Sequence, residues 1–455
     1  MTALSGPIVF NNSGSGSDTA ASGCGPATPV SVMLQFSNGS STAQGSWTGT
    51  ISPGDIVYVP ANSGRKFNVV SSASSGTGTI NFDSAWGDDQ FGTTGYVGGK
   101  RATIDNSDSR RLFHEDVSDD NWDVEIEYTG SDYAVTSSID LAGHKTITGT
   151  GSSKPSIKAS NFAGSIFSIA AIGTTYSSLT PYHNYSFQNL DLSVSATRTY
   201  PTDTSMITPS GSTAAKWNFY DCTFNTGSST TDVAFELNQD DWSFRNCVFK
   251  CTLAGIYLTS NLNVKILGCY FQDGQYGTAS SLDIDSISIV GSVFDSQTVR
   301  SVSTSFAGTL VNNIIYNSAS GVNLGSSGQS HYGGTIVYGN IFHSCTNAIE
   351  GYSSQNIQGN GFYSNTTKYN FTAGFGTYPW TIDDVDFTAD PLTDPANGDF
   401  SLSSGVTSEV NAYLPLGAAS TTGGAPALES LSLRSFDSST GGGGSGAVLH
   451  PLRSN

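Results

Sequence analysis

Positive charge is scarce in this chain of 455 residues. Only 18 residues are Lys or Arg, against 37 Asp and Glu, and the formal net charge is −19 at pH 7. Nucleic-acid binding needs clustered Lys and Arg to neutralise phosphates, so the composition predicts no nucleic-acid partner. Charged residues of both signs make up 12% of the chain, and this scarcity of Lys and Glu disfavours long surface helices.

Long apolar runs are also missing. No stretch approaches the roughly 20 consecutive apolar residues that cross a bilayer as a helix, so no membrane insertion is expected. Residues 1–10 lack a basic region followed by an apolar core. The sequence therefore predicts no classical signal peptide.

The chain does contain a six-residue phrase that recurs from Phe187 to Phe362. Its first and sixth positions are apolar, its third is Asn, Asp or Gly, its fourth is small or polar, and its second and fifth accept any residue. Its third positions lie 20 to 32 residues apart, and a period near 22 is typical of a parallel β-solenoid. Asn, Asp and Gly tolerate a left-handed bend, so we expect a corner at the third position. A second short strand follows in several repeats, as at 233–237 and 282–284.

The fourth position of the phrase predicts a buried column that stabilises the stack. Thiols occupy it first and amides later: Cys222, Cys247, Cys269, Asn313, Asn340 and Asn360. Buried amides can hydrogen-bond to the backbone and to each other along the stack. A zinc site with Cys251 as fourth ligand is the alternative, but a regular column points its side chains along one line rather than at one centre. No metal or other cofactor is expected there.

The fifth position should point outward and is apolar in five successive repeats. We call these residues the apolar stripe: Val248, Tyr270, Val293, Ile314 and Ile341. A soluble monomer rarely leaves such a surface uncovered. Either a neighbouring subunit covers it, as in a homotrimer of parallel rods, or the chain's own C-terminal arm does so through Leu431, Leu433 and Phe436.

Three regions follow from these patterns. Residues 1–128 are rich in Gly and Ser with strand-like runs and are expected to form a β-rich cap or attachment module. Residues 129–405 are expected to form the solenoid, and residues 406–455 a C-terminal extension with a Gly-rich linker. A solenoid needs such a cap because its terminal strands would otherwise expose an open edge.

Several motifs resemble a known superfamily. The opening at 144–151, the coils with Asn or Gly followed by an aromatic residue, and the Asp390-Pro391 ending resemble the right-handed parallel β-helix, or pectate-lyase-like, superfamily over roughly residues 130–405. The phrases at 14–26 and 98–105 further resemble uncharacterised β-helix proteins of bacteriophages. The superfamily includes lyases, polygalacturonases, phage tailspikes and non-catalytic virion proteins, so the resemblance implies the fold and leaves the activity open.

The resemblance also supplies candidate catalytic residues. Polygalacturonase-like members pair carboxylates for hydrolysis, and here Asp240 and Asp241 merge two of their motifs while the other two motifs are missing. Lyase-like members use acidic residues to bind Ca2+ and a cation as base, which Asp283, Asp285, Arg245 and Lys265 could provide. Solvated surface carboxylates are the simpler interpretation of the same residues.

These patterns favour a non-catalytic structural protein of a tailed-phage virion, placed at the virion surface as a capsid decoration or tail component. Its rod would project outward, its terminal segments would dock on other virion proteins, and host surface polysaccharide is its candidate ligand. Loops carrying Arg198, Tyr200 and His331 could contribute to a sugar-binding groove. The alternatives are a tailspike-type depolymerase or lyase acting on an acidic polysaccharide, and an extracellular adhesin on a bacterial surface.

Overall fold

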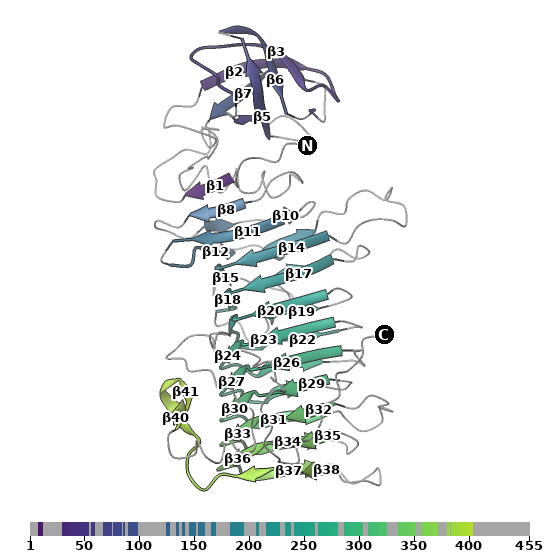
Figure 1. Ribbon diagram of the computed structural model, residues 1–455, viewed down its shortest axis with the longest axis vertical. Helices are drawn as coiled ribbons and strands as arrows, with labels where there is room; N and C mark the ends of the chain where they lie inside the picture. The colour runs from purple at the N-terminus through teal and green to yellow at the C-terminus, as the bar shows by residue number, and fades with distance from the viewer. Residues whose placement is uncertain are drawn as a thin grey trace, which may run out of the picture.

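The chain forms a long rod of stacked parallel β-strands (Figure 1). The computed structural model describes residues 8–11, 30–98 and 124–403, with short gaps inside the last two ranges. Within these residues, strands and a single 3-10 turn at Pro395–Asn397 make up the regular structure. The all-β fold and the parallel β-helix expected from the repeat are thus confirmed.

Twelve strands stack in register to make the first sheet of the rod, and each pairs with its equivalent in the next coil. They are β1 Ile8–Asn11, β8 Val124–Glu127, β11 Lys145–Thr150, β14 His183–Gln188, β17 Ala215–Tyr220, β20 Asp241–Arg245, β23 Asn263–Leu267, β26 Ser286–Val290, β29 Gly308–Val311, β32 Ile336–Tyr338, β35 Asn356–Gln358 and β38 Trp380–Ile382.

The second sheet has eleven strands and follows the first after a tight corner in each coil. Its strands are β9 Tyr133–Val135, β12 Ser156–Ala159, β15 Asp191–Val194, β18 Thr223–Asn225, β21 Val248–Lys250, β24 Tyr270–Gln272, β27 Val293–Asp295, β30 Ile314–Tyr316, β33 Ile341–His343, β36 Gly361–Tyr363 and β39 Val385–Asp386. The six-residue phrase therefore spans the end of one strand, the corner and the start of the next strand.

The third side of the rod is built from two shorter sheets. One contains β10 Ile139–Leu141, β13 Phe167–Ile169 and β16 Ile207–Thr208, and the other contains β19 Val233–Leu237, β22 Ala254–Leu258, β25 Tyr276–Ser280, β28 Arg300–Ser303, β31 Ser320–Leu324, β34 Asn347–Gly351 and β37 Thr367–Phe371. The backbone N–H of Met206 donates to the carbonyl of Ala234 at 2.8 Å, so the two sheets adjoin. The strand expected at 282–284 lies outside the described residues, and the described third-side strand of that coil is β25.

The rod begins earlier in the sequence than residue 129. Strand β1 pairs in parallel with β8, Ile8 opposite Val124, and β8 pairs with β11. Both strands belong to the first sheet, so the predicted cap region contributes two strands to the rod itself. The physical reason is that an in-register parallel strand satisfies backbone groups that the terminal coil would otherwise leave open.

The remainder of the N-terminal region is inserted between β1 and β8. It is a closed antiparallel barrel of β2 Val30–Phe36, β3 Thr42–Trp47, β4 Ile56–Tyr58, β5 Phe67–Ala73, β6 Thr77–Phe82 and β7 Gln90–Gly98. Its own core includes Phe36 stacked on Trp86 with ring centroids 4.6 Å apart. Closure leaves the barrel without an open strand edge.

Aromatic stacks fill the interior of the rod. Trp217 stacks on Trp242 at 5.1 Å between centroids, and Phe271 stacks on Phe249 at 4.4 Å and on Phe294 at 4.6 Å. Parallel in-register coils place equivalent side chains directly above one another, so a repeated Phe becomes a continuous column. These buried stacks fix the register of the coils that they join and thereby the position of the outward-facing side chains on those coils.

Candidate functional site

The corners between the first and second sheets set the geometry of everything outside them. All eight third positions of the phrase have a left-handed backbone, with φ between 52° and 66°: Asn189, Asp221, Asn246, Gly268, Gly291, Asn312, Gly339 and Gly359. Asn, Asp and Gly bear this conformation at least cost. The corner residues thus turn the chain at the same point of each coil.

The fourth-position column is buried directly behind these corners. The amide of Asn313 donates to Oδ1 of Asn340 at 2.9 Å, and the amide of Asn340 donates to Oδ1 of Asn360 at 3.0 Å. The Asn340 amide also donates to the carbonyl of Leu310 at 3.0 Å. The amides therefore satisfy one another and the backbone along the stack.

The cysteines of this column are free thiols rather than disulfides. Cys222 Sγ donates to the carbonyls of Phe187 and Tyr220, both at 3.4 Å. Burial raises the pKa of the Cys222 and Cys247 thiols well above their usual value. Because only a thiolate binds metals or attacks as a nucleophile, these thiols act as packing groups.

Asp384 ends the amide ladder, and the sequence pattern gave no sign of it. One of its carboxylate oxygens accepts the backbone N–H of Asn360 at 2.7 Å, and the other accepts the Tyr369 hydroxyl. Burial and the hydrogen bond to the Asp384 carboxylate raise the pKa of Tyr369. Asp384 thus satisfies the donors that the last amide of the ladder leaves open.

A second ladder lies at the far end of the second sheet, and the sequence analysis missed it. The amide of Gln297 donates to the carbonyl of Phe271 at 3.1 Å, and the amide of Asn365 donates to that of Phe342 at 2.8 Å. A left-handed residue precedes each member, such as Ser296 before Gln297. Polar residues placed two and three positions after the last apolar residue of the phrase were the available signal.

The apolar stripe is covered by a segment of the same chain. A hairpin of β40 Leu392–Asp394 and β41 Asp399–Leu402 lies beside the second sheet (Figure 1). Val293, Ile314 and Ile341 retain 2%, 6% and 0% exposure. They form one buried cluster with Phe387, Leu392 and Phe400, against which Tyr270 packs, while Val248 lies outside this cluster.

The cover that the structure describes comes from a segment that the sequence analysis did not suggest for this role. Leu431, Leu433 and Phe436 lie outside the described residues, and the observed cover is supplied by residues 387–402. Gly361 makes room for it, because a Cβ at this position would lie 2.3 Å from the Phe387 ring. The fifth position of the next repeat after the apolar stripe is thus a glycine, at the point where the covering segment packs against the rod.

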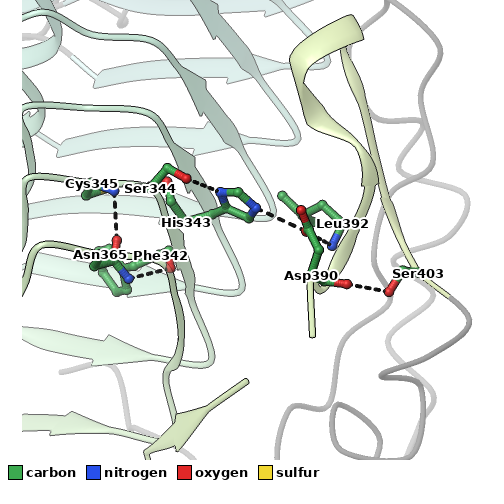
Figure 2. Close-up of polar contacts among 8 residues, drawn as sticks. All are labelled: Phe342, His343, Ser344, Cys345, Asn365, Asp390, Leu392 and Ser403. Atoms are coloured by element: carbon green, nitrogen blue, oxygen red, sulfur yellow. Dashed lines mark hydrogen bonds and ion pairs between the residues drawn. The ribbon is translucent and has the colours of Figure 1, made fainter. Parts of the chain in front are cut away.

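His343 fastens the hairpin to the rod (Figure 2). Its Nε2 lies 3.0 Å from Oδ1 of Asp390, and its Nδ1 lies 2.9 Å from the hydroxyl of Ser344. Asp390 also accepts the backbone N–H of Leu392 at 2.9 Å, while its carbonyl accepts the hydroxyl of Ser403 at 2.6 Å. His343 is 5% exposed, and its imidazole joins the hairpin to the rod through the Asp390 carboxylate.

The order Ser344, His343, Asp390 has the residue types of a hydrolase triad. However, Ser344 occupies a left-handed corner that Ser296 and Ser364 occupy in other coils. The position of Ser344 is therefore explained by the repeat. Asp390, the carboxylate partner of His343, comes from the segment that leads into the hairpin. We interpret the three residues as a structural contact.

The candidate catalytic residues fall partly outside the described residues. Asp240, Asp283 and Asp285 do so, as do the loop residues Arg198, Tyr200 and His331. Asp241 and Arg245 lie at the two ends of β20, on the outer face of the first sheet. The Arg245 guanidinium stands 5.9 Å from the ring centroid of Tyr220 in the preceding coil.

Two features bear on ligands and membranes. The described residues contain no group of three or more His, Cys, Asp or Glu placed to hold a metal ion. Among the same residues, no helix is long and apolar enough to cross a membrane.

Comparisons with known proteins return likenesses in structure only. No family model and no curated protein matches the chain. A protein described as ORF18 of Geobacillus virus E2 has a TM-score of 0.42 and 11% identity, with 63% of this chain and 59% of that chain covered. Tailspike protein 3 of bacteriophage CBA120 has a TM-score of 0.30 and 14% identity, with 62% and 59% covered.

A third likeness is to the catalytic domain of a GH87 alpha-1,3-glucanase. The TM-score is 0.25 and the identity 11%, with 81% of this chain and 89% of that chain covered. The chain spans 59% of the length of each of the two phage proteins.

Proposed function

We propose that this chain is a non-catalytic structural protein on the surface of a tailed-phage virion, with the β-helix as an outward rod that binds glycan. The terminal segments dock on other virion proteins, and the chain assembles as a homotrimer. The motifs that resemble phage β-helix proteins support the phage assignment. The rod supports the structural role, since its core and ladder continue from coil to coil.

The observation that carries the non-catalytic role is the outer face of the first sheet. From β14 to β29, the strands contain a single acidic residue, Asp241. Glycoside hydrolysis uses a pair of carboxylates that flank the scissile bond. On these strands Asp241 has no carboxylate partner, and the neighbouring outward residues are amides, hydroxyls and cations.

Two measurements test this proposal. Peptide mass spectrometry of purified particles of the phage that encodes the chain should find it among the virion proteins. Incubation of the full-length chain with acidic polysaccharides should release neither reducing ends nor unsaturated uronates. Absence from the particles would contradict the virion role, and release of either product would establish the depolymerase instead.

A further inference from the structure

Three cations gather on one face of this acidic rod. Lys216, Arg245 and Lys265 lie on β17, β20 and β23, which are adjacent strands of the first sheet. All three side chains are exposed, whereas Trp217, Phe244 and Ile266 beside them point into the core. With strands about 4.8 Å apart, the three charges span roughly 10 Å along the rod.

In the part of the chain that the structure describes, these cations have almost no structural partners. Within the described residues, Lys216 and Lys265 take part in no ion pair or side-chain hydrogen bond, and the Arg245 guanidinium interacts only with the Tyr220 ring, 5.9 Å from its centroid. Elsewhere on the rod, Arg300 pairs with Glu350 at 3.4 Å and Lys368 pairs with Asp386 at 3.1 Å. In a chain with twice as many acids as bases, unpaired cations on one face indicate a ligand that supplies the anions.

The surroundings of the cations narrow the chemistry of that ligand. Asp241 lies opposite Lys216, and Asp221 follows Tyr220 at the corner. Ser243 and Asn263 add hydroxyl and amide groups on the same face. A polyphosphate offers these two carboxylates no hydrogen-bond donor, whereas a glycan presents hydroxyls that can donate to them.

We infer that the face around Lys216, Arg245 and Lys265 binds a glycan that carries carboxylate groups. The cations pair with the sugar carboxylates, Asp241 accepts hydrogen bonds from sugar hydroxyls, and the Tyr220 ring provides an aromatic group on which a sugar ring can pack. This inference rests on the proposed function and deepens it, because it gives the ligand of the rod a chemical class and a place.

The test measures binding of the full-length chain to polygalacturonate, alginate and hyaluronate by biolayer interferometry, with dextran and polyphosphate as reference polymers. At least one uronate polymer should bind, dextran should not, and binding should weaken as salt is raised. Lys265→Glu and Arg245→Gln should each raise the Kd about tenfold, the effect of one charge-assisted hydrogen bond.

Lys250→Glu is the matched control. Lys250 is also an exposed lysine without a partner in the described residues, but it lies on β21 in the second sheet. The Lys250→Glu substitution makes the same change in net charge as Lys265→Glu and should leave the Kd unchanged. An equal loss in this control would overturn the inference, as would polyphosphate binding as tight as that of the uronates or the absence of binding to all three.

Product release is measured in the same samples. Cleavage of a bound glycan would overturn the proposed non-catalytic role and leave the binding face in place. Failure to bind by a chain that is present in phage particles would overturn the binding face and leave the virion role in place.

Discussion

At the residue scale, each member of the fourth-position column is suited to burial in a different way. Asn340 is fully buried and uses its side chain as both donor and acceptor. The thiols of Cys222 and Cys247 need far less, because a buried Cys behaves as a small hydrophobe with a weak donor. Amides therefore tie adjacent coils together by hydrogen bonds, and thiols only fill space.

Asn340→Leu should lower the free energy of unfolding by about 1 to 3 kcal/mol, because the carbonyl of Leu310 and the backbone N–H of Asn313 lose a buried partner. The midpoint of urea unfolding reports the loss. Asn263→Leu is the control, since Asn263 is exposed on β23 and its side chain makes no hydrogen bond in the described residues. Equal midpoints for the two variants would contradict a stabilising ladder.

The buried thiols should resist modification in the folded protein. Burial raises the pKa of both Cys251 and Cys345 to about 12, so almost no thiolate is present at pH 8. In a Cys24→Ser background, a disulfide reagent such as DTNB should react with the five described cysteines only after guanidinium unfolding. Rapid reaction in buffer would show that the column opens to solvent.

At the element scale, the C-terminal hairpin decides which part of the second sheet is free. It buries Val293, Ile314 and Ile341 beneath Phe387, Leu392 and Phe400, and the pairing of His343 with Asp390 holds it in place. Tyr316 and Tyr363 pack on either face of the imidazole, with centroids 5.1 and 5.0 Å away. The hairpin thus forms part of a buried cluster on this side of the rod.

Gly361→Val should detach the hairpin while leaving the coils intact, because its Cβ would meet the Phe387 ring at 2.3 Å. Hydrogen exchange should accelerate at the backbone N–H of Phe387 and of Ser403, which donate to Phe362 and Pro391. Ile341→Val, in the same column, is the control and should cost only about 0.5 to 1.5 kcal/mol. Unchanged exchange in Gly361→Val would mean that Phe387 does not anchor the hairpin.

At the scale of the whole molecule, the covered stripe changes where subunits could meet. Ile314 is already 6% exposed within one chain, so a homotrimer has to use other surfaces of the rod. Ile314→Asp should therefore speed exchange in the hairpin and leave the native mass by light scattering equal to that of the unchanged chain. A lower native mass for the variant would show that the apolar stripe is a contact between subunits.

The sequence by itself determined the period of the rod, its corners and its buried columns. These features are local, because a residue such as Asn246 can bend the chain left-handed at its own position, and identical columns arise whenever coils stack in register. The same local logic would also have predicted the second ladder at Gln297 and Asn365 had the pattern been followed further along each coil.

Only the tertiary structure decided which distant segments meet. The apolar residues of the stripe indicate that something must cover it, but any apolar segment would satisfy that requirement. In the folded chain, Phe387 and Phe400 pack on it. Likewise, the pairing of β1 with β8 across the inserted barrel spans more than a hundred residues, and no local pattern encodes it. Lys216, Arg245 and Lys265 became one face for the same reason, since the length of each coil fixes which outward residues become neighbours.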